Sequence, residues 1–556
     1  MRLKSVAVCL ASLLLLTLCF SPYAYSDNLP AQTPLDRYVK TPDSSYQWKV
    51  QSANTIDGVK MVVVDMTSQT WRTASDVNRT EWKHWLTFAI PAELKSDIGM
   101  LFIGGGRNGS DPPAAPSDRV VQIARGTGAV VAELGMVPNQ PLVFHNDGRN
   151  RTEDDLIAYT TEQFLASGDP TWPVRNAMVK SAVRALDTMT AVMASPTGGG
   201  RKVDRFVVAG GSKRGWTTWL TGAVDDRVIG IVPIVIDVLN VQESMRHHFA
   251  AYGFWAPAVG DYVEHRLMER MQHPRMAELY AFEDPYYYRH RLTKPKLVLN
   301  ASGDQFFLPD SSQFYWNDLQ GPKYLRYVPN ADHGLGGTDA VETIAAFYWL
   351  LQHDKLPPEY AWTEESDGAF RVTTKVAPKE VRLWQANNPE ARDFRVETLG
   401  RKYTSSVVQV GADGAYVVHA DKPAHGWTAY FVELTYDVGA PVPLKLTTNV
   451  RVTPDTLPFA NKNPAQPATL TVVCTAASED AAAKLVEEAK AFATEQKAAD
   501  DFTSKQIGTR CYFNLGSVAD GRSKGEKFTG WLKQQGADKI RYQLESGPEI
   551  TIAPGL

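Results

Sequence analysis

The sequence predicts an α/β protein: a mostly parallel sheet with helices on both faces, followed by a smaller β-rich or α+β C-terminal region. Two observations lead to this prediction. From about residue 85, strand-like apolar runs alternate with helical stretches, which is the pattern of a parallel sheet covered by helices. From about residue 368, short alternating runs separated by Gly and Pro replace this pattern, and such runs are typical of antiparallel strands.

Length and charge narrow the class of protein further. The chain has 556 residues, enough for about two to four domains. Lys and Arg total 58 against 62 Asp and Glu, and the formal net charge is -4. This balance provides no basic surface for nucleic acid or anionic lipid, so the sequence argues against both as partners.

The N-terminus predicts export. Residues 1–26 are organised like a secretory signal peptide, with Arg2 and Lys4 before an apolar run at 6–20 and small residues leading to Ser26. The run of about 15 residues is shorter than the roughly 20 that a membrane-spanning helix needs. We therefore expect a periplasmic or secreted protein that is cleaved near Ser26 and keeps no transmembrane anchor.

The predicted elements follow in order along the chain. The first strand-like run is 57–66. Further strand-like stretches lie at 85–90, 99–103, 128–134, 205–209, 230–238, 296–301 and 324–328. Helical patterns lie between them at 154–165, 174–194, 213–223 and 338–351. The connection at 239–294 is long and rich in aromatic residues and His, and we expect it to form a cap-like insertion.

We expect three folded parts after the signal peptide. The α/β part covers 27–365 and contains the insertion at 239–294. A β-sandwich-like module covers 366–460, where short strands alternate with Gly and Pro. A small α+β segment covers 461–556 and includes a helix rich in Ala, Glu and Lys.

Cysteine usage bears on the last segment. Only Cys474 and Cys511 remain once the signal peptide is removed. In an exported chain we expect them to form one disulfide, and two separate free thiols are the alternative. Because no Cys and His residues cluster at zinc-ligand spacing, we expect no metal site, and the sequence implies no cofactor.

The sharpest motif is Val-Val-Ala-Gly-Gly-Ser-Lys-Arg-Gly-Trp at 207–216, where a β-branched strand runs through two glycines and Ser212 into a helix. A nucleophilic serine needs such a turn, because small neighbours permit the strained backbone and the helix N-terminus stabilises negative charge. The usual spacing is G-x-S-x-G, but here the second glycine comes one residue later, at Gly215. The motif is similar to the G-x-S-R-x-G elbow of glucuronoyl esterases, with Lys213 in place of arginine. The alternative is a plain strand–helix turn capped by a serine.

An acid and a histidine follow later strands in the order that α/β-hydrolases use. The strand at 296–301 leads to Asp304, and the strand at 324–328 leads to His333. We expect His333 to act as the general base for Ser212 and Asp304 to orient the imidazole. Asp237 is an alternative acid, because it ends an earlier predicted strand.

A glycine run supplies the candidate oxyanion site. Backbone N–H groups of Gly105 and Gly106, together with that of Lys213, are placed to bind a tetrahedral oxyanion. A flexible glycine turn is the alternative. The adjacent Lys213 and Arg214 have two interpretations: they recognise an anionic substrate group, or they form ion pairs at the start of the helix. The nearby Trp and Phe residues also have two interpretations: they line a pocket, or they belong to the core.

Several of these motifs resemble one known family. Ser-Gln-Thr-Trp at 68–71, Ile-Gly-Gly-Gly at 103–106, Gly-Gly-Ser-Lys-Arg-Gly-Trp at 210–216 and Ser-Gly-Asp-Gln-Phe-Phe at 302–307 are similar to the PhoPQ-activated pathogenicity-related proteins. The resemblance runs from about residue 35 into the β module. It implies an α/β-hydrolase-like fold, export, and a link to virulence regulation and resistance to antimicrobial peptides, but no settled substrate.

These observations predict an exported serine hydrolase that acts by acyl transfer on a small-molecule ester or a peptide. A sugar-linked or other small ester is favoured by the likeness of the elbow to that of glucuronoyl esterases. The alternative function is a catalytically inactive protein of the same fold that binds a peptide or a component of the cell envelope.

Overall fold

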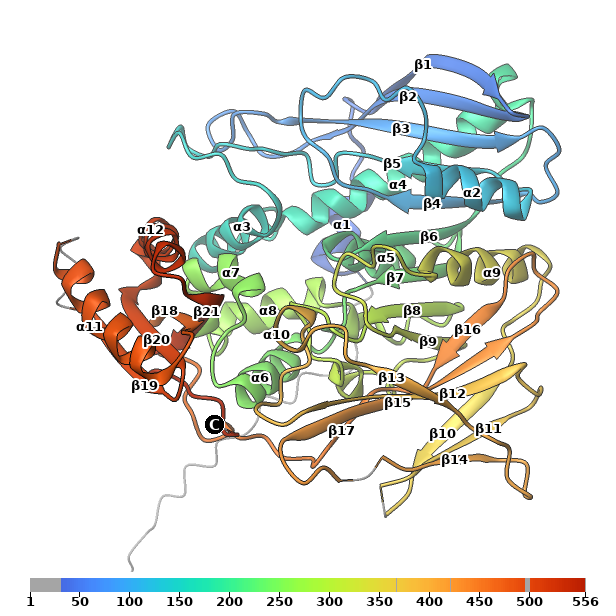
Figure 1. Ribbon diagram of the computed structural model, residues 1–556. Coiled ribbons are helices and arrows are strands. Elements are labelled where there is room, and N and C mark those ends of the chain that lie inside the picture. Colours follow the sequence, from blue (N-terminus) through green and yellow to red (C-terminus); the bar gives the residue numbers. More distant parts are fainter. Residues whose placement is uncertain (1–31, 367, 421, 496–500, 556) are drawn as a thin grey trace, which may run out of the picture.

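The computed structural model describes residues 32–366, 368–420, 422–495 and 501–555, so the predicted signal peptide lies outside the described residues. A nine-stranded sheet with the order β1-β2-β3-β5-β4-β6-β7-β8-β9 forms its centre (Figure 1). Its strands are β1 (Gln47–Ile56), β2 (Val59–Thr70), β3 (Glu81–Pro91), β4 (Ile98–Ile103), β5 (Val131–Leu134), β6 (Arg205–Gly211), β7 (Val228–Ile234), β8 (Lys296–Ala301) and β9 (Lys323–Val328). No helix in the described part of the chain is both long enough and apolar enough to span a bilayer.

The direction of the strands divides the sheet in two. β1, β2, β3 and β5 pair antiparallel in turn, whereas β5, β4, β6, β7, β8 and β9 pair parallel. Helices connect the parallel strands and lie on both faces of the sheet (Figure 1). The predicted fold class is confirmed: the chain has an α/β-hydrolase-like sheet, with Ser212 on the turn that follows β6.

Successive side chains of the central strands point to opposite faces of the sheet, and each face is covered by a layer of helices. All six residues of β4 are buried. Leu101 and Ile103 belong to the core under α4 (Val174–Ala194) and α5 (Lys213–Val224). Met100 and Phe102 belong to the core on the other face. The helices α2 (Asp118–Thr127) and α9 (Ala340–Gln352) cover that second face. A continuous apolar strand is therefore buried from both sides, as parallel sheets require.

The structure departs from the predicted strands at two places. The sequence indicated no strand before residue 57, but residues 47–56 form β1, an antiparallel edge strand whose residues are mostly exposed. The strand predicted at 230–238 ends at Ile234, because Val235 takes a positive φ of 44° and the chain leaves the sheet.

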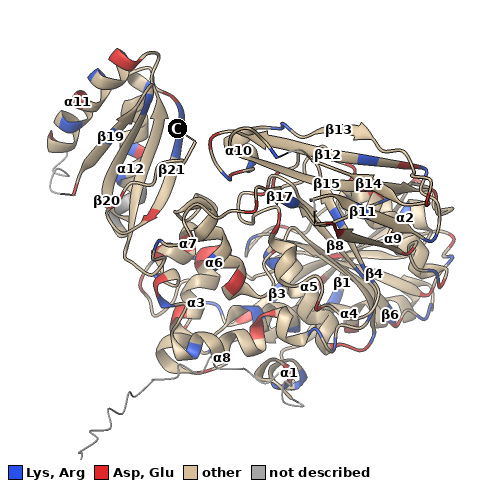
Figure 2. Ribbon diagram, turned by 90° about the horizontal axis from the view of Figure 1, so that it is seen from below, with Lys and Arg blue, Asp and Glu red and all other residues tan. Residues whose placement is uncertain are grey.

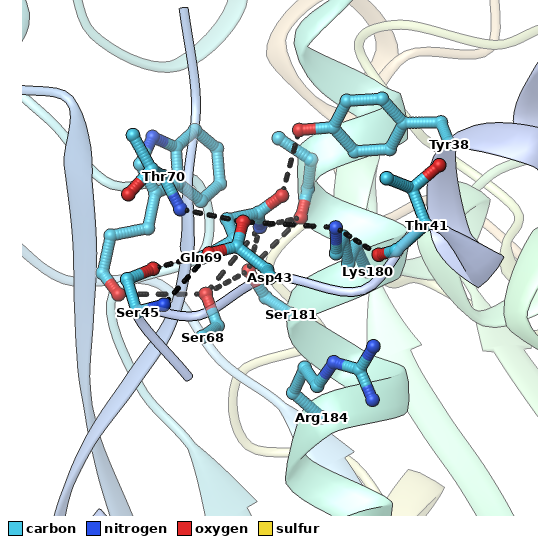
Figure 3. Close-up of polar contacts among 12 residues, drawn as sticks. Tyr38, Thr41, Asp43, Ser45, Ser68, Gln69, Thr70, Lys180, Ser181 and Arg184 are labelled. Atoms are coloured by element: carbon cyan, nitrogen blue, oxygen red, sulfur yellow. Dashed lines mark hydrogen bonds and ion pairs between the residues drawn. The ribbon is translucent and has the colours of Figure 1, made fainter. Parts of the chain in front are cut away.

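A buried polar cluster joins the N-terminal helix α1 (Pro34–Lys40) to β2 and α4 (Figure 3). The Gln69 amide donates to Ser181 Oγ at 3.0 Å and accepts from Tyr38 Oη at 2.8 Å. The buried ammonium of Lys180 donates to the carbonyl of Thr41 at 2.9 Å. The motif at 68–71 therefore holds elements together rather than forming a site.

The segment 239–294 is helical. It contains α6 (Val241–Tyr252), α7 (Gly260–Glu264), α8 (Pro274–Glu283) and short 3-10 turns at Pro257–Val259, Met268–Arg270 and Pro285–Tyr288. Other helical elements of the α/β part are α3 (Glu153–Ser167) and turns at Pro196–Gly198 and Ser311–Phe314. We refer to 239–294 as the cap.

Two antiparallel sheets pack next to β9. One has the order β10-β11-β14 and the other β13-β12-β15-β16, with β17 paired to β15. Their elements are β10 (Tyr360–Glu364), β11 (Phe370–Thr374), β12 (Glu380–Asn388), α10 (Val396–Leu399), β13 (Thr404–Val407), β14 (Tyr416–Val418), β15 (Trp427–Tyr436), β16 (Leu444–Thr447) and β17 (Arg451–Thr453). β10 lies before the boundary expected at 366 and pairs with β11. A buried ion pair between Arg326 of β9 and Glu433 of β15 joins the two parts.

A small α+β unit completes the chain and lies beside α7 of the cap (Figure 2). Its sheet has the order β19-β20-β18-β21. The elements are β18 (Ala468–Thr475), α11 (Glu479–Glu495), β19 (Thr503–Ile507), β20 (Arg510–Ser517), a 3-10 turn (Val518–Asp520), α12 (Gly521–Gln534) and β21 (Asp538–Ser546). Trp255 of the cap and Leu544 of β21 exchange backbone hydrogen bonds of 2.8 and 3.2 Å, which fastens this unit to the cap.

The two cysteines lie within this unit. Cys474 of β18 and Cys511 of β20 are directly opposed cross-strand partners, and both are buried. The structure has them as free thiols, so the disulfide that we expected is not formed in it. A hydrogen bond to Cys511, and then burial, raise the pKa of Cys474, because the two sulfurs are in contact. The disulfide stays a prediction.

Candidate active site

Ser212 occupies the sharp turn between β6 and α5. Its backbone has φ 58° and ψ -127°, a conformation that L-residues seldom adopt. The Ser212 N–H donates to the carbonyl of Ile234 at the end of β7, at 2.8 Å. Helix α5 begins at the next residue, so its N-terminus faces the serine.

The spacing of glycines around Ser212 follows from how closely α5 approaches the sheet. A Cβ at Gly210 would lie 2.6 Å from the carbonyl oxygen of Arg214. A Cβ at Gly215 would lie 2.9 Å from the carbonyl oxygens of Gly210 and Ile234. The usual elbow pattern has a glycine two residues after the serine. In this chain the close approach of α5 requires the glycine one residue later, at Gly215.

The predicted acid and histidine come together. Asp304, after β8, is 3% exposed, and its Oδ2 lies 2.8 Å from Nδ1 of His333, after β9. The second carboxylate oxygen accepts from the N–H of Phe306 at 2.8 Å. The Gln305 amide oxygen accepts from the His333 N–H at 2.8 Å and links the two loops. Asp304 therefore orients the imidazole through Nδ1, and Gln305 holds the backbone of His333.

The other ring nitrogen of His333, Nε2, is available to form a hydrogen bond. Nε2 is buried and has no hydrogen-bond partner among the described residues. The Phe306 ring packs against the imidazole with centroids 4.4 Å apart, and Phe307 follows at 6.1 Å. Both phenylalanines line the cavity that Ser212 also lines. No hydrogen bond between Ser212 and His333 is present in the described residues.

Asp237, the alternative acid, has other partners. Tyr315 Oη donates to one of its carboxylate oxygens at 2.6 Å and Tyr327 Oη to the other at 2.5 Å. Burial, together with the charges of Asp304 and Asp310, raises the pKa of Asp237 to about 8. The structure thus pairs Asp304, and not Asp237, with the histidine.

The glycine run lies beside the elbow. Ile103, at the end of β4, is the register partner of Gly210 in β6. The guanidinium of Arg214 passes 2.7 Å from the position that a Cβ of Gly105 would take. The N–H groups of Gly105 and Gly106 donate no hydrogen bond to any described residue, and the Lys213 N–H has no acceptor within its helix. Three unpaired donors therefore lie close to the serine turn.

Lys213 and Arg214 form ion pairs inside the protein. Glu153, at the start of α3, receives two hydrogen bonds from Arg214 at 2.7 and 2.8 Å. Lys213 Nζ lies 2.8 Å from Glu153 and 3.2 Å from Asp154. Burial raises the pKa of Glu153, but Arg214 and Lys213 outweigh burial and hold that pKa at about 2. Both cations are neutralised, so the structure favours the ion-pair alternative.

A cavity of about 110 Å³ opens beside Ser212. Eleven of its 21 lining residues come from the cap, and most of the lining is apolar. Among the Trp and Phe residues that follow the predicted site motifs or lie in the cap, Trp216, Phe306 and Phe307 line the cavity, whereas Trp219, Trp255 and Trp316 are buried elsewhere. Among the described residues, no group of three or more His, Cys, Asp or Glu is arranged to hold a metal ion.

Three residues of the site carried no signal in the sequence. Glu153 pairs with residues about sixty positions later, and an acidic residue in the first turn of a helix is ordinary. The Gln140 side chain donates to the Gly106 carbonyl at 3.1 Å and accepts from the Glu153 N–H at 2.6 Å. Gln305 lies within the motif that pointed to Asp304, but its bond to the His333 loop depends on the fold.

Known proteins match most of the chain. The model of the family described as PhoPQ-activated pathogenicity-related protein matches residues 35–395. Autocrine proliferation repressor protein A of Dictyostelium discoideum is 37% identical over an alignment of 458 residues, and the alignment covers 77% of this chain and 92% of that protein.

Solved structures match with lower similarity. Acetyl xylan esterase 1 from Thermoanaerobacterium sp. is 16% identical with a TM-score of 0.40, over 58% of this chain and 92% of that one. A glucuronoyl esterase from Solibacter usitatus is 14% identical with a TM-score of 0.30, over 54% and 86%. These likenesses are too low to carry an argument about activity. The family match covers more than half of the sequence, and we conclude that this chain belongs to the PhoPQ-activated pathogenicity-related protein family.

Proposed function

We propose that this chain is an exported serine hydrolase of the α/β-hydrolase type, which transfers an acyl group from an ester, or from a peptide, to water through Ser212. One observation carries the proposal. The 2.8 Å pair of His333 and Asp304 lies against phenylalanines that line the same cavity as the strained serine turn. A fixed histidine with an unpaired Nε2, near a partly exposed serine on a strained turn, is what nucleophilic catalysis requires.

The roles of the residues follow from this arrangement. Ser212 Oγ attacks the carbonyl carbon while its proton passes to His333 Nε2, and Asp304 stabilises the imidazolium. The N–H groups of Gly105, Gly106 and Lys213 bind the oxyanion. The intermediate collapses, the bond to the leaving group breaks, and His333 returns the proton to that group. Water then attacks the acyl-enzyme in the same way and releases the acid.

Two features support an ester over a peptide bond. The elbow resembles that of glucuronoyl esterases in its sequence. The charged side chains that line the cavity are paired with one another, and none is left to bind the charged terminus of a peptide. The predicted signal peptide at residues 1–26 supports export.

Labelling with a fluorophosphonate probe tests the proposal. We expect the mature protein to be labelled, and Ser212→Ala and His333→Ala to abolish labelling. Ser75→Ala, an exposed serine on a surface turn, serves as the control and should be labelled like the wild type. Folded wild-type protein that stays unlabelled would contradict the proposal, provided that circular dichroism shows the same fold for all four proteins.

One observation favours a second candidate function. The name of the relative from Dictyostelium describes repression of proliferation and no chemical reaction. A catalytically inactive protein that binds a peptide or an envelope component accounts for such a name without any catalysis. Absence of labelling, together with saturable binding of a peptide, would support this second function.

A further inference from the structure

We propose that the cavity beside Ser212 selects an uncharged, apolar acyl group, so that the preferred substrates are esters of medium-length aliphatic acids. The inference rests on the proposed function and specifies its substrate class. It depends on three properties of the cavity: the nature of its walls, the balance of its charges, and its position relative to the histidine.

The walls contributed by the cap are apolar and adaptable. Met245, Met268 and Met276 line the cavity and are 8%, 7% and 3% exposed. Leu267, Met271 and Leu279 extend the same surface. Methionine has an unbranched, flexible side chain that adapts to different apolar shapes. Walls of this kind fit a flexible alkyl chain better than a rigid polar ring such as a sugar.

The charges that line the cavity cancel. Arg175 and Glu283 are both buried and form an ion pair at 3.0 Å. Lys213 is paired with Asp154 at 3.2 Å. Burial also raises the pKa of Tyr262, whose hydroxyl donates to Asp154 at 2.9 Å, so this phenol stays neutral. A charged substrate group would lose its hydration here without gaining a free partner, which is strongly unfavourable.

The position of the cavity assigns it to the acyl side of the ester. Ser212 and Lys213 line the cavity, whereas His333 is absent from the described residues that line it. The leaving group must lie within hydrogen-bond reach of His333, because that residue returns the proton to it. The part of the substrate that enters the cavity is therefore the acyl group.

The first experiment measures kcat/KM for 4-nitrophenyl esters of acetate, butyrate, hexanoate and octanoate, alongside fluorophosphonate labelling. Each methylene that enters the cavity should raise kcat/KM by about fourfold, until the cavity is filled. The 4-nitrophenyl monoester of adipate, which ends in a carboxylate, should react at least tenfold more slowly than the hexanoate ester. Lengthening the alcohol instead, in alkyl acetates, should change kcat/KM by less than twofold.

The second experiment fills the cavity. Leu279→Trp should lower the ratio of kcat/KM for hexanoate to that for acetate by tenfold or more. The matched control is Glu278→Trp, which places the same side chain on the exposed face of α8. Met271→Trp, at a partly exposed lining position, should lower the same ratio and serves if Leu279→Trp does not fold.

The outcomes separate this inference from the proposed function. A labelled protein that cleaves acetate, with no preference for longer acyl chains or with equal rates for adipate and hexanoate, would overturn the acyl preference and leave the hydrolase intact. A chain-length preference on the alcohol side, or a ratio unchanged by both cavity variants, would overturn it too. A folded protein that is neither labelled nor active on any ester would overturn both.

Discussion

At the scale of single residues, Asp237 is a buried acid whose two oxygens both accept hydrogen bonds from tyrosines. Burial raises its pKa from 3.8 to about 8, so the folded protein holds this proton at neutral pH while the unfolded chain releases it. The stabilisation is complete below about pH 4 and is lost as the pH rises towards 8, by at most about 1.4 kcal/mol per pH unit. Asp237→Asn, which cannot ionise, should therefore remove part of the pH dependence.

Urea unfolding at pH 5 and pH 8 measures this effect. The free energy of unfolding of the wild type should fall more between these two values than that of Asp237→Asn. All other titrating groups are common to the two proteins and cancel in the comparison. Equal changes in both proteins would show that Asp237 ionises normally in the folded state.

The residues of the candidate site were predictable to different degrees. Ser212, Asp304 and His333 each follow a predicted strand, and chain order indicated the pairing of Asp304 with His333 that the structure has. Glu153 was not predictable, because its contacts with Lys213 and Arg214 connect segments that are distant in the sequence. Sequence spacing identifies groups that follow strands, but it does not identify which charges neutralise each other across the fold.

At the scale of elements, the β module supports the loop that carries His333. The Asn330 amide accepts from the Tyr403 N–H at 2.9 Å and donates to the Tyr403 carbonyl at 2.8 Å. The N–H of Val396 donates to the carbonyl of Gly303, beside Asp304, at 3.0 Å. The module thus contacts both loops, and it holds the acid and the histidine in register.

Removing the Asn330 side chain tests this support. Asn330 has a positive φ of 56°, so Asn330→Gly removes the amide without adding backbone strain. We expect fluorophosphonate labelling to slow by about tenfold or more, because a small misplacement of the base is costly. Asn317→Ala, at an exposed position before β9, is the control. Labelling of folded Asn330→Gly at the wild-type rate would show that the β module does not position His333.

Strands were predictable from the sequence where both faces of the sheet are covered and all side chains of the strand are buried. β4 and β8 are buried throughout and lie where the sequence indicated. β1 was missed, since most of its side chains are exposed at the edge of the sheet and it carries little hydrophobic pattern. β10 is similarly exposed, and only its pairing with β11 assigns it to the β module. An edge strand is recognised by its hydrogen-bonded pairing with a neighbouring strand. The sequence of the edge strand alone does not indicate which strand that neighbour is.

At the scale of the whole molecule, the C-terminal unit adjoins the cap. Its β21 pairs with Trp255, whose side chain is buried, and the Thr551 hydroxyl donates to the carbonyl of Gly253 at 2.9 Å. The unit therefore restrains the end of α6, which also provides Met245 to the cavity. The stability of the C-terminal unit therefore affects how strongly the cap is held in position.

The proposed export has a consequence for this unit that can be measured. In an oxidising compartment Cys474 and Cys511 should form a disulfide, because Cα atoms of directly opposed strand residues lie within the range that a disulfide spans. Protein recovered after export and then denatured should show no free thiol, and its mass should be about 2 Da below that of the reduced chain, since two protons leave with two electrons. The same chain without residues 1–26, made in a reducing cytosol, should show two thiols.

Closing the loop from Cys474 to Cys511 should also stabilise the unit, by up to about 4 kcal/mol if the loss of chain entropy in the unfolded state dominates. The double variant Cys474→Ser, Cys511→Ser is the control, and its unfolding should not depend on the compartment in which it was made. Two titratable thiols in denatured exported protein would rule out the bond. Because the C-terminal unit is fastened to the cap through Trp255, the oxidised protein should also lose less of its preference for longer acyl chains on warming than the reduced protein does.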